Sequence, residues 1–333
     1  MNPDDLWSPF ESVATNYDEL VQCINGVCNK AQQKELQFAW RGQRDASWGL
    51  FSSLHRRLRW TRNTALTEKD IFTTESDILK EVHRWGLHMS PAVGRMSILH
   101  QLATLQHYGA PTRLIDVTFN PWIAAWFCVE NTDTECDARL FAIDVTDRLI
   151  NEQDELRAWE DCLIRPWPIP PEQFEKVRIR RGHPSDDESK RLNNNRFKEW
   201  TTSVYAWKPP HINNRIAAQN GAFIFGGVPA GTDHKLRVPK GPEEKAGKWS
   251  MEEVRACTSI ARRPHKLDYK RGSIAKNPTY TIRIKASARN DLRKRLEENF
   301  GYKHSTIYPD YTGFAQFGKP KLRSRPPARE GQI

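Results

Sequence analysis

Three polar segments that lie far apart in the chain contain the residues best suited by type and spacing to act on a ligand. The first is residues 40–43, where a β-prone run ends at Trp40, Arg41, Gly42 and Gln43. Arginine at the end of a strand can hold an anion through two parallel hydrogen bonds, and the adjacent glycine lets a ligand approach the backbone. The alternative is a turn in which Arg41 makes only a surface ion pair.

The second segment, residues 108–118, contains Thr112, Arg113, Asp116 and Thr118. Side chains alternate with a period of two along a strand, so Thr112, Asp116 and Thr118 share one face. Because the flanking sequence is apolar, these polar groups are costly unless they are hydrogen-bonded or act on a ligand. The alternative is that Asp116 only caps the neighbouring helix and pairs with Arg113 or with the arginine of the first segment.

The third segment is residues 213–223. Arg215 and Gln219 are four residues apart, so on a helical turn they share a face and can converge on one ligand. A capped helix that leads into a strand explains the same residues without a functional role. If the three segments meet, they form a polar site that holds an anionic ligand through Arg41.

The elements that must position these segments alternate between helix and strand. Helices are predicted at residues 17–24, at 67–85 with Thr67 as N-cap, at 96–107, from Pro121 onward with Asn120 as N-cap, and after Ser287 through Leu296. Strands are predicted at residues 36–40, 113–117, 140–145, 223–225 and 280–284, each short and bounded by Gly, Pro, Asp or Asn. This alternation predicts an α+β fold.

Length, cysteine content and apolar runs argue against an exported or membrane-spanning protein. At 333 residues the chain can bury a full core. The six cysteines include no CxxC pair, and Cys128 lies in an apolar run, so we interpret them as reduced packing residues of a cytoplasmic protein. The N-terminus lacks a basic region followed by an apolar stretch, and the longest apolar run, residues 121–129, is far shorter than the roughly 20 residues of a membrane-spanning helix. Export and membrane insertion are therefore disfavoured.

The net charge of +10 is concentrated at the C-terminal end. Residues 255–333 hold 19 Lys and Arg against 6 Asp and Glu. A basic region of this kind can follow the phosphates of a nucleotide or of nucleic acid, such as single-stranded RNA or DNA, with a salt-dependent affinity. A solvated surface and a tail explain the same charge without a partner.

Common catalytic motifs are absent from the sequence. There is no GxGxxG opening a βαβ unit, no GxxxxGK[ST] phosphate loop, no HExxH and no GxSxG elbow, and the histidines show no metal-ligand spacing. A zinc enzyme and a serine hydrolase are disfavoured, and no metal is expected.

A single domain with loop insertions is predicted. Residues 1–29 are expected to form an N-terminal helical extension, and residues 30–317 the domain itself. Insertions are expected at about residues 165–198, which begin Pro-rich and carry dense mixed charge, and at 229–249, which are rich in Pro, Gly and Lys. Residues 318–333 are predicted to be a disordered basic tail.

Several of these blocks together resemble the FRG domain, a bacterial family named for its Phe-Arg-Gly motif. They are WRGQ at 40–43, LQHYGAPTRLIDVTFNPWIAAWF at 105–127, NNRIAAQNGAF at 213–223, and the closing YTIRIKASARNDLRKRLEENFGY and STIYPDYTGFA at 280–302 and 305–315. The middle block is the specific one, and the resemblance covers roughly residues 30–317. Trp40 stands where Phe or Tyr is usual, and Tyr308 where Phe is usual.

The order of elements is also similar to that of ADP-ribosyltransferases of the Arg, Ser-x-Ser, Glu type. In that comparison Arg41 and Gly42 match the first-strand Arg-Gly, residues 116–118 stand where the Ser-x-Ser is found, and Gln219 falls near the catalytic Glu. The resemblance implies a split, mostly antiparallel β core with helices packed around it, NAD as the substrate and no metal.

The resemblance also implies residue roles. The catalytic group would be Arg41, Asp116, Thr118 and Gln219, with Arg41 on the phosphate or ribose side of NAD and Asp116 and Thr118 orienting the arginine or the ribose. Because the amide of Gln219 stabilises a cation less than a carboxylate does, either Asp116 supplies the missing charge or activity is altered or absent. The cofactor-binding residues would be Arg41, Gly42 through its backbone, Gln43, Tyr108 stacked on the ring, Thr112, Arg113 and Arg215.

The FRG resemblance further implies a role in bacterial anti-phage defence or a toxin–antitoxin system, with nucleic acid as the target and an antitoxin protein as a partner. The competing hypothesis is a non-catalytic module that binds a nucleotide or nucleic acid. A third hypothesis is cleavage of NAD or a nucleoside without transfer. Release of nicotinamide and labelling of a target would distinguish the three.

Overall fold

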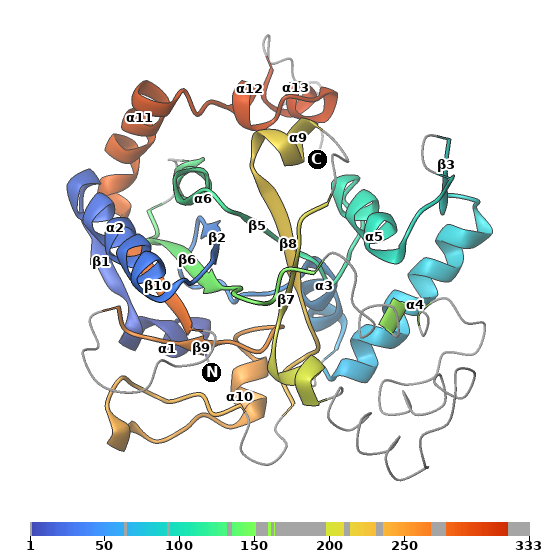
Figure 1. Cartoon of the computed structure of the whole chain (residues 1–333), viewed down its shortest axis with the longest axis horizontal. Helices are drawn as coiled ribbons and strands as arrows, with labels where there is room; N and C mark the ends of the chain where they lie inside the picture. The colour runs from blue at the N-terminus through green and yellow to red at the C-terminus, as the bar shows by residue number, and fades with distance from the viewer. Residues whose placement is uncertain are drawn as a thin grey trace, which may run out of the picture.

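One mixed β-sheet organises the chain in the computed structural model, which describes residues 2–62, 65–91, 94–131, 135–150, 159–160, 163, 198–209, 214–230, 236–267 and 278–318. The strand order is β1–β10–β6–β2–β5–β8–β7, with β9 beside β10 (Figure 1). The strands are β1 (Ser12–Ala14), β2 (Phe38–Gln43), β5 (Ile115–Thr118), β6 (Ala138–Asp144), β7 (Tyr205–Trp207), β8 (Gly221–Phe225), β9 (Arg263–Pro264) and β10 (Pro278–Ile284); β3 (Met89–Ser90) and β4 (Gly94–Arg95) pair separately.

The sheet is mostly antiparallel and nearly divides in the middle. Only β1 and β9 run parallel to their neighbour β10 among the described strands. Whereas β2 pairs with β6 from Phe38 to Gln43, it pairs with β5 through Trp40 and Thr118 alone. The sheet is therefore two halves joined by one residue pair.

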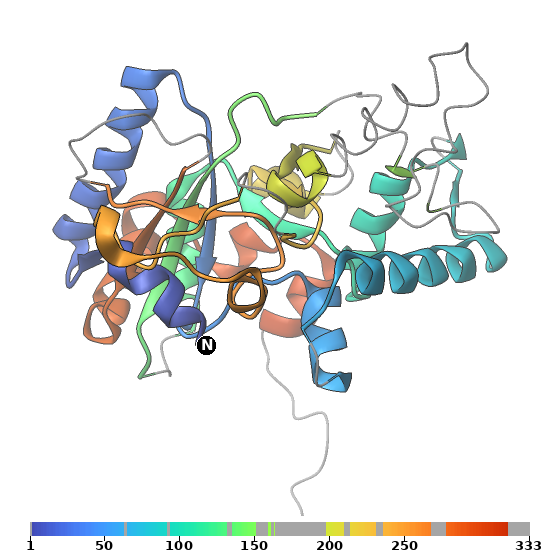
Figure 2. The same cartoon turned by 90° about the horizontal axis from the view of Figure 1, so that it is seen from below.

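Helices pack on both ends and faces of the sheet. Figure 2 shows α2 at one end of the molecule and α4 and α5 at the other, with the sheet between them. The helices are α1 (Pro3–Trp7), α2 (Tyr17–Lys34), α3 (Ser53–Thr61), α4 (Glu68–Arg84), α5 (Ile98–His107), α6 (Pro121–Val129), α9 (Asn214–Ala218), α10 (Met251–Arg255), α11 (Arg289–Phe300), α12 (His304–Ile307) and α13 (Tyr311–Phe317), with short 3-10 turns at Ser8–Phe10, Glu244–Ala246 and Ala286–Ala288. The predicted combination of helices with a mostly antiparallel sheet is confirmed.

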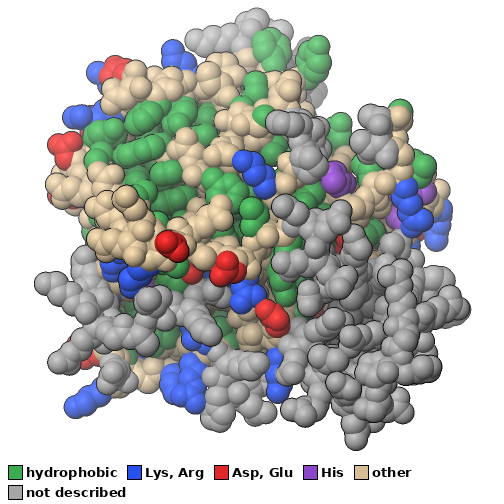
Figure 3. Space-filling view, viewed as in Figure 1, with side chains coloured by type: hydrophobic (Ala, Val, Ile, Leu, Met, Phe, Trp, Pro, Cys, Tyr) green, Lys and Arg blue, Asp and Glu red, His purple; other side chains and the backbone are tan. Residues whose placement is uncertain are grey.

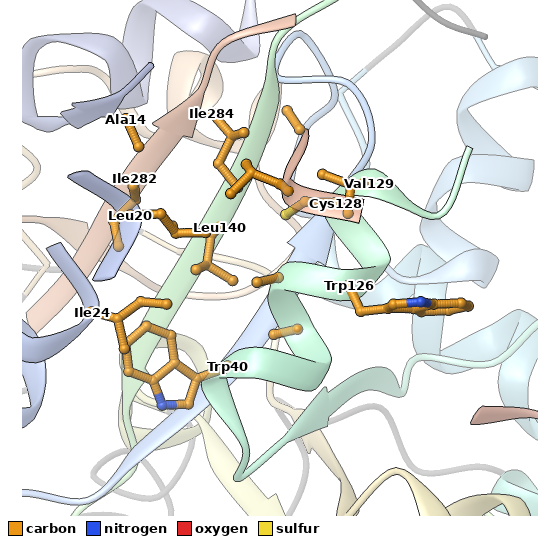
Figure 4. Packing of buried hydrophobic residues seen from close by; sticks show 14 of the residues in the cluster. Ala14, Leu20, Ile24, Trp40, Trp126, Cys128, Val129, Leu140, Ile282 and Ile284 are labelled. Carbon is orange, nitrogen blue, oxygen red and sulfur yellow. The ribbon is translucent and has the colours of Figure 1, made fainter. Parts of the chain in front are cut away.

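The alternation of side chains along each strand builds a core on both faces. In β6, Leu140 packs in a cluster with α2, α6 and α11, whereas the next residue, Phe141, packs in a second cluster on the opposite face. Figure 4 shows Trp40, Leu140 and Ile282, from three strands, in the first cluster together with Ile24 of α2. A third cluster lies under α4 and α5 against β7 and β8. Burial of apolar area in these clusters fixes the sheet between its helices.

Capping residues start two of the predicted helices as expected. Thr67 forms a capping box with Asp70 at the start of α4. Asn120 accepts from two backbone N–H groups at the start of α6, where Pro121 is the first residue. The prediction that Ser287 caps α11 was wrong, because that serine lies inside a 3-10 turn and α11 follows Ala288, whose side chain makes no cap.

Residues 3–34 pack with the sheet. Strand β1 pairs with β10, and α2 continues without interruption across the predicted boundary between residues 29 and 30. Glu11 forms ion pairs with the buried Arg139 and with Arg283. These contacts make the segment part of the same body.

The predicted insertions are only partly described. Residues 164–197, the tail from 319 onward and Asn213 lie outside the described residues. In the second predicted insertion, Leu236 and Val238 are buried in the core cluster that contains Phe141.

The face drawn in Figure 3 carries hydrophobic side chains gathered over α2, α6 and α11. Tyr17 of α2, Trp122 of α6 and Phe300 of α11 stack in a row, with ring centroids 6.1 and 5.3 Å apart. No helix in the described ranges is both long and apolar enough to cross a bilayer.

Candidate active-site cleft and adjoining groove

A cleft of about 350 Å³ opens where β2 and β5 part, between α5 and α6. Residues from all three polar segments line it, as do side chains from α5 and α6 and the residue after α12. Its lining includes Arg41, Gly42, Gln106, Asp116, Thr118, Phe127, Arg215, Gln219 and Tyr308. Helices α9 and α12 lie side by side at one end of β8 (Figure 1), and Arg215 and Ile216 of α9 line the cleft.

Arg41 bridges the two halves of the sheet with its side chain. Its Nη1 donates to the backbone oxygen of Asp116 at 2.6 Å and lies 3.9 Å from the Asp116 carboxylate. The side chain keeps 20% of its surface exposed. Burial lowers the pKa of Arg41, Asp116 opposes that shift, and nearby Arg56 adds to it. The guanidinium is therefore held in place by a single carbonyl and a loose ion pair. Its Nε is buried without a hydrogen-bond partner among the described residues, and the exposed part of the fork is open to an anion.

Asp116 is the acidic residue of the cleft among the described lining residues. Its carboxylate is 66% exposed and accepts from Gln106 Nε2 at 2.8 Å. Gln106 in turn accepts from the Thr112 hydroxyl. This relay orients one carboxylate oxygen and leaves the carboxylate open to a ligand in the cleft.

Thr118 and Gln219 are joined across the sheet. The Thr118 hydroxyl donates to the Gln219 backbone oxygen at 2.7 Å and accepts from the Asn120 N–H at 2.9 Å. Gln219 Nε2 donates to the Ile307 carbonyl at 3.0 Å. Because the amide nitrogen donates within the fold, an interaction of Gln219 with a ligand falls to its side-chain oxygen, which is an acceptor.

Arg215 and Tyr308 form the wall opposite β2. Arg215 pairs with Asp310 at 2.8 Å, and its guanidinium lies 4.9 Å from the centre of the Tyr308 ring. The Tyr308 hydroxyl donates to Glu130 at 2.7 Å, and burial, reinforced by that carboxylate, raises the pKa of Tyr308. Neither Tyr308 nor Glu130 was assigned to the site from the sequence. The Tyr-Pro-Asp turn at residues 308–310 was the available signal for Tyr308.

Gly42 permits the close packing that forms the cleft wall. A Cβ there would lie 2.0 Å from the Ala124 backbone oxygen and 2.9 Å from the Cys128 backbone nitrogen, both in α6. Since backbone atoms cannot move aside as a flexible side chain can, only glycine fits at this position.

Four residues expected to bind the cofactor, Arg113 among them, lie outside the cleft. Tyr108 is 79% exposed and contacts the edge of His107, so it does not stack over the site. Thr112 is fully buried and acts through Gln106. Gln43 is buried, donates from Nε2 to the Gly49 carbonyl at 3.1 Å, and lies beside the larger groove described below.

Arg113 is the clearest correction. Its side chain is 3% exposed and pairs with Glu68 at 2.9 Å and Glu75 at 2.6 Å. Burial acts to lower the pKa of Arg113, but the two carboxylates outweigh it and raise the pKa. Burial raises the pKa of Glu75 to about 7. This cluster serves folding and leaves no surface of Arg113 for a cofactor.

A second, larger hollow of about 1370 Å³ adjoins the cleft and shares Arg41, Gly42, Phe127 and Tyr308 with it. Four more arginines and two exposed tryptophans line this groove: Arg44, Arg56, Arg59, Arg293, Trp48 and Trp60. Sequence reasoning missed these residues, although the run His55-Arg56-Arg57-Leu58-Arg59-Trp60 carried the signal. Within the described ranges no three His, Cys, Asp or Glu side chains are grouped to hold a metal.

Comparison with known families identifies one segment of the chain. The FRG domain family model matches residues 36–137. The chain contains an FRG domain. The matched part runs from just before β2 to just after α6, so Arg41, Asp116 and Thr118 lie within the FRG match, whereas Arg215 and Gln219 lie beyond it. Neither the curated proteins nor the solved structures gave a match to this chain.

Proposed function

We propose that this FRG protein is an ADP-ribosyltransferase-like enzyme that cleaves NAD and modifies a macromolecular target. The observation that carries the proposal is the meeting of Arg41, Asp116 and Gln219, from three distant segments, around one cleft at the point where the sheet divides. A bacterial cytoplasm is the proposed location, and anti-phage defence or a toxin–antitoxin system the proposed setting.

The reaction would break the bond between C1′ of the nicotinamide ribose and the pyridine nitrogen. Nicotinamide leaves with the electron pair, and C1′ passes through an oxocarbenium-like state. A hydroxyl or amine of the target then attacks C1′ and loses its proton. Arg41 would bind the phosphate side of NAD, because its guanidinium faces the cleft with part of its fork unused.

The carboxylate of Asp116 would stabilise the positive charge that develops on the ribose. Gln219 is neutral, so its amide oxygen would accept from a ribose hydroxyl and position the sugar rather than supply charge. The Gln106 hydrogen bond would hold Asp116 in the orientation needed for this role.

The second candidate is a module that binds a nucleotide without turnover. Two features favour it: Gln219 lacks the charge of a catalytic carboxylate, and the Thr118 hydroxyl is used within the fold. Such a module would bind NAD through Arg41 and release no nicotinamide.

Transfer from NAD labelled on its adenine half separates the two candidates. The full chain is incubated with the label and with RNA, DNA or cell lysate. Covalent label on a macromolecule is expected from the wild type and not from Arg41→Ala or Gln219→Ala. Arg57→Ala is the matched control, because Arg57 is exposed on α3 and donates to the Gly109 carbonyl outside the cleft. Binding of NAD with no label and no nicotinamide would instead establish the binding module.

A further inference from the structure

The groove beside the cleft is too large for a small molecule alone. Its volume of about 1370 Å³ exceeds the roughly 300–1,000 Å³ of typical small-molecule sites. Because it shares Arg41 and Gly42 with the cleft, a ligand lying in the groove would reach the proposed reacting centre.

The groove carries an excess of fixed positive charge. Five arginines line it against two glutamates among the described residues, and both glutamates are engaged: Glu297 pairs with Arg293, and Glu130 accepts from Tyr308. Arg56 is exposed and close enough to Arg41 to lower its pKa. Arg41 and Arg56 line the same groove, and neighbouring cations of this kind favour a ligand with a repeated negative charge.

Aromatic faces accompany these arginines. Trp60 is 79% exposed at the end of α3, and Trp48 is 42% exposed with the Arg44 guanidinium 5.6 Å from its ring centre. Arg59 lies 4.6 Å from the centre of the Phe51 ring, and Phe51 stacks on the buried His55 at 4.9 Å. Large exposed aromatic side chains beside a cationic track are the arrangement on which unpaired bases stack while the backbone follows the charge.

We propose that this groove binds single-stranded nucleic acid, with phosphates on Arg56 and Arg44 and a base on Trp60. The further statement that the bound strand is the acceptor of ADP-ribose rests on the proposed function. This surface differs from the C-terminal region suggested by composition, because Arg293 is the only lysine or arginine of residues 255–318 among the described lining residues.

Fluorescence anisotropy of labelled oligonucleotides of about 16 nucleotides tests the proposal with the full chain. Single-stranded DNA, single-stranded RNA of the same sequence and the DNA duplex are compared. The single strands are expected to bind more tightly than the duplex. Trp60→Ala is expected to weaken binding roughly 5- to 150-fold, the loss of one stacked base. Arg56→Ala is expected to reduce the slope of log K against log salt by about 0.7, the loss of one phosphate contact to a single strand.

Each variant has a matched control in the same protein. Arg57→Ala removes the neighbouring exposed arginine of α3, which does not line the groove, and Trp85→Ala removes a tryptophan that is 74% exposed elsewhere. Both are expected to bind as the wild type does. The proposal is overturned if the wild type does not bind, if the duplex binds as tightly as the single strands, or if the controls weaken binding as much as Trp60→Ala and Arg56→Ala.

Nicotinamide release, measured on the same preparations without nucleic acid, keeps this proposal separate from the proposed function. Strand binding without NAD cleavage would leave the groove assignment standing and remove the transferase. NAD cleavage without strand binding would overturn the groove assignment and leave NAD cleavage by the cleft standing.

Discussion

Arg113 and Arg41 are both expected from the sequence to bind a cofactor, and the structure puts them in opposite environments. Arg113 is 3% exposed between two buried glutamates, whereas Arg41 is 20% exposed, bonds to one carbonyl and faces a cleft. A buried cation must be paired inside the protein, because its desolvation is otherwise too costly. A cation at the edge of a cleft can leave part of its hydrogen-bonding capacity to a ligand.

The comparison separates residues that hold the fold from residues that can act. The Arg113 cluster ties α4 to the start of β5, since Glu68 and Glu75 both lie on α4. The Arg41 region instead lies where the two halves of the sheet meet, at the single residue pair between Trp40 of β2 and Thr118 of β5. Loss of the Arg113 side chain should therefore appear in stability, and loss of the Arg41 side chain in activity.

The largest expected effect on stability is that of Arg113→Ala. The substitution leaves Glu68 and Glu75 buried without their cation, so the free energy of unfolding should fall by about 3–5 kcal/mol. Urea denaturation measures it, with Arg57→Ala as the exposed control. A loss below about 1 kcal/mol would mean that the cluster is not the structural centre described here.

Gly42→Ala should have the next largest effect on stability. It tests whether the backbone of β2 beside Arg41 is packed closely against α6. The new Cβ would overlap the Ala124 oxygen of α6, so the helix must move away from β2 at a cost of about 1–3 kcal/mol or more. The thermal midpoint reports the loss. Gly86→Ala is the contrast: nothing lies within 4 Å of its Cβ, and only its φ of +74° opposes the change. Equal effects at the two positions would contradict the close packing.

His55 should make a smaller contribution to stability, and one that depends on pH. Unlike the buried Arg113, which is paired with two glutamates, the buried His55 ring has no hydrogen-bond partner among the described residues. Burial, with Arg59 nearby, lowers the pKa of His55 to about 3. Because the folded pKa lies below the unfolded value of about 6.5, the stability from neutral His55 is complete above pH 6.5 and is lost as the pH falls toward 3.

The comparison of wild type with His55→Phe isolates this term. The wild type should lose up to about 1.4 kcal/mol per pH unit below pH 6.5 more than the variant does, because phenylalanine keeps the stack on Phe51 and does not titrate. Urea denaturation at pH 6.5 and 5.5 measures the difference. Parallel pH profiles would show that His55 protonates without cost in the folded state.

Local signals in the sequence predicted much of the fold. Asn120 before Pro121 and Thr67 before an acidic turn were enough to place the starts of α6 and α4, because a cap acts within a few residues of the helix. The meeting of the three polar segments was also expected, and they do line one cleft. Their catalytic and cofactor roles stay predictions.

The environment of each arginine could not be read from its own segment. Arg113 is buried because Glu68 and Glu75 reach it from α4, 45 and 38 residues earlier in the chain. These two glutamates are seven residues apart on one helix face, and that spacing was the available signal. The groove was missed for a similar reason. Arg56 and Trp60 of α3 become informative only once the fold is seen to line one groove with them and with Arg41 of β2.

Nicotinamide release from NAD by wild type and Arg41→Ala, per folded molecule, tests the central claim most directly. Loss of Arg41 should lower the rate by about 10²–10³-fold. Arg41→Lys should recover little of it, because lysine keeps the charge but not the planar fork. Urea denaturation should show both variants folded. Release at the wild-type rate by folded Arg41→Ala, or no release by the wild type, would contradict a cleft built around that guanidinium.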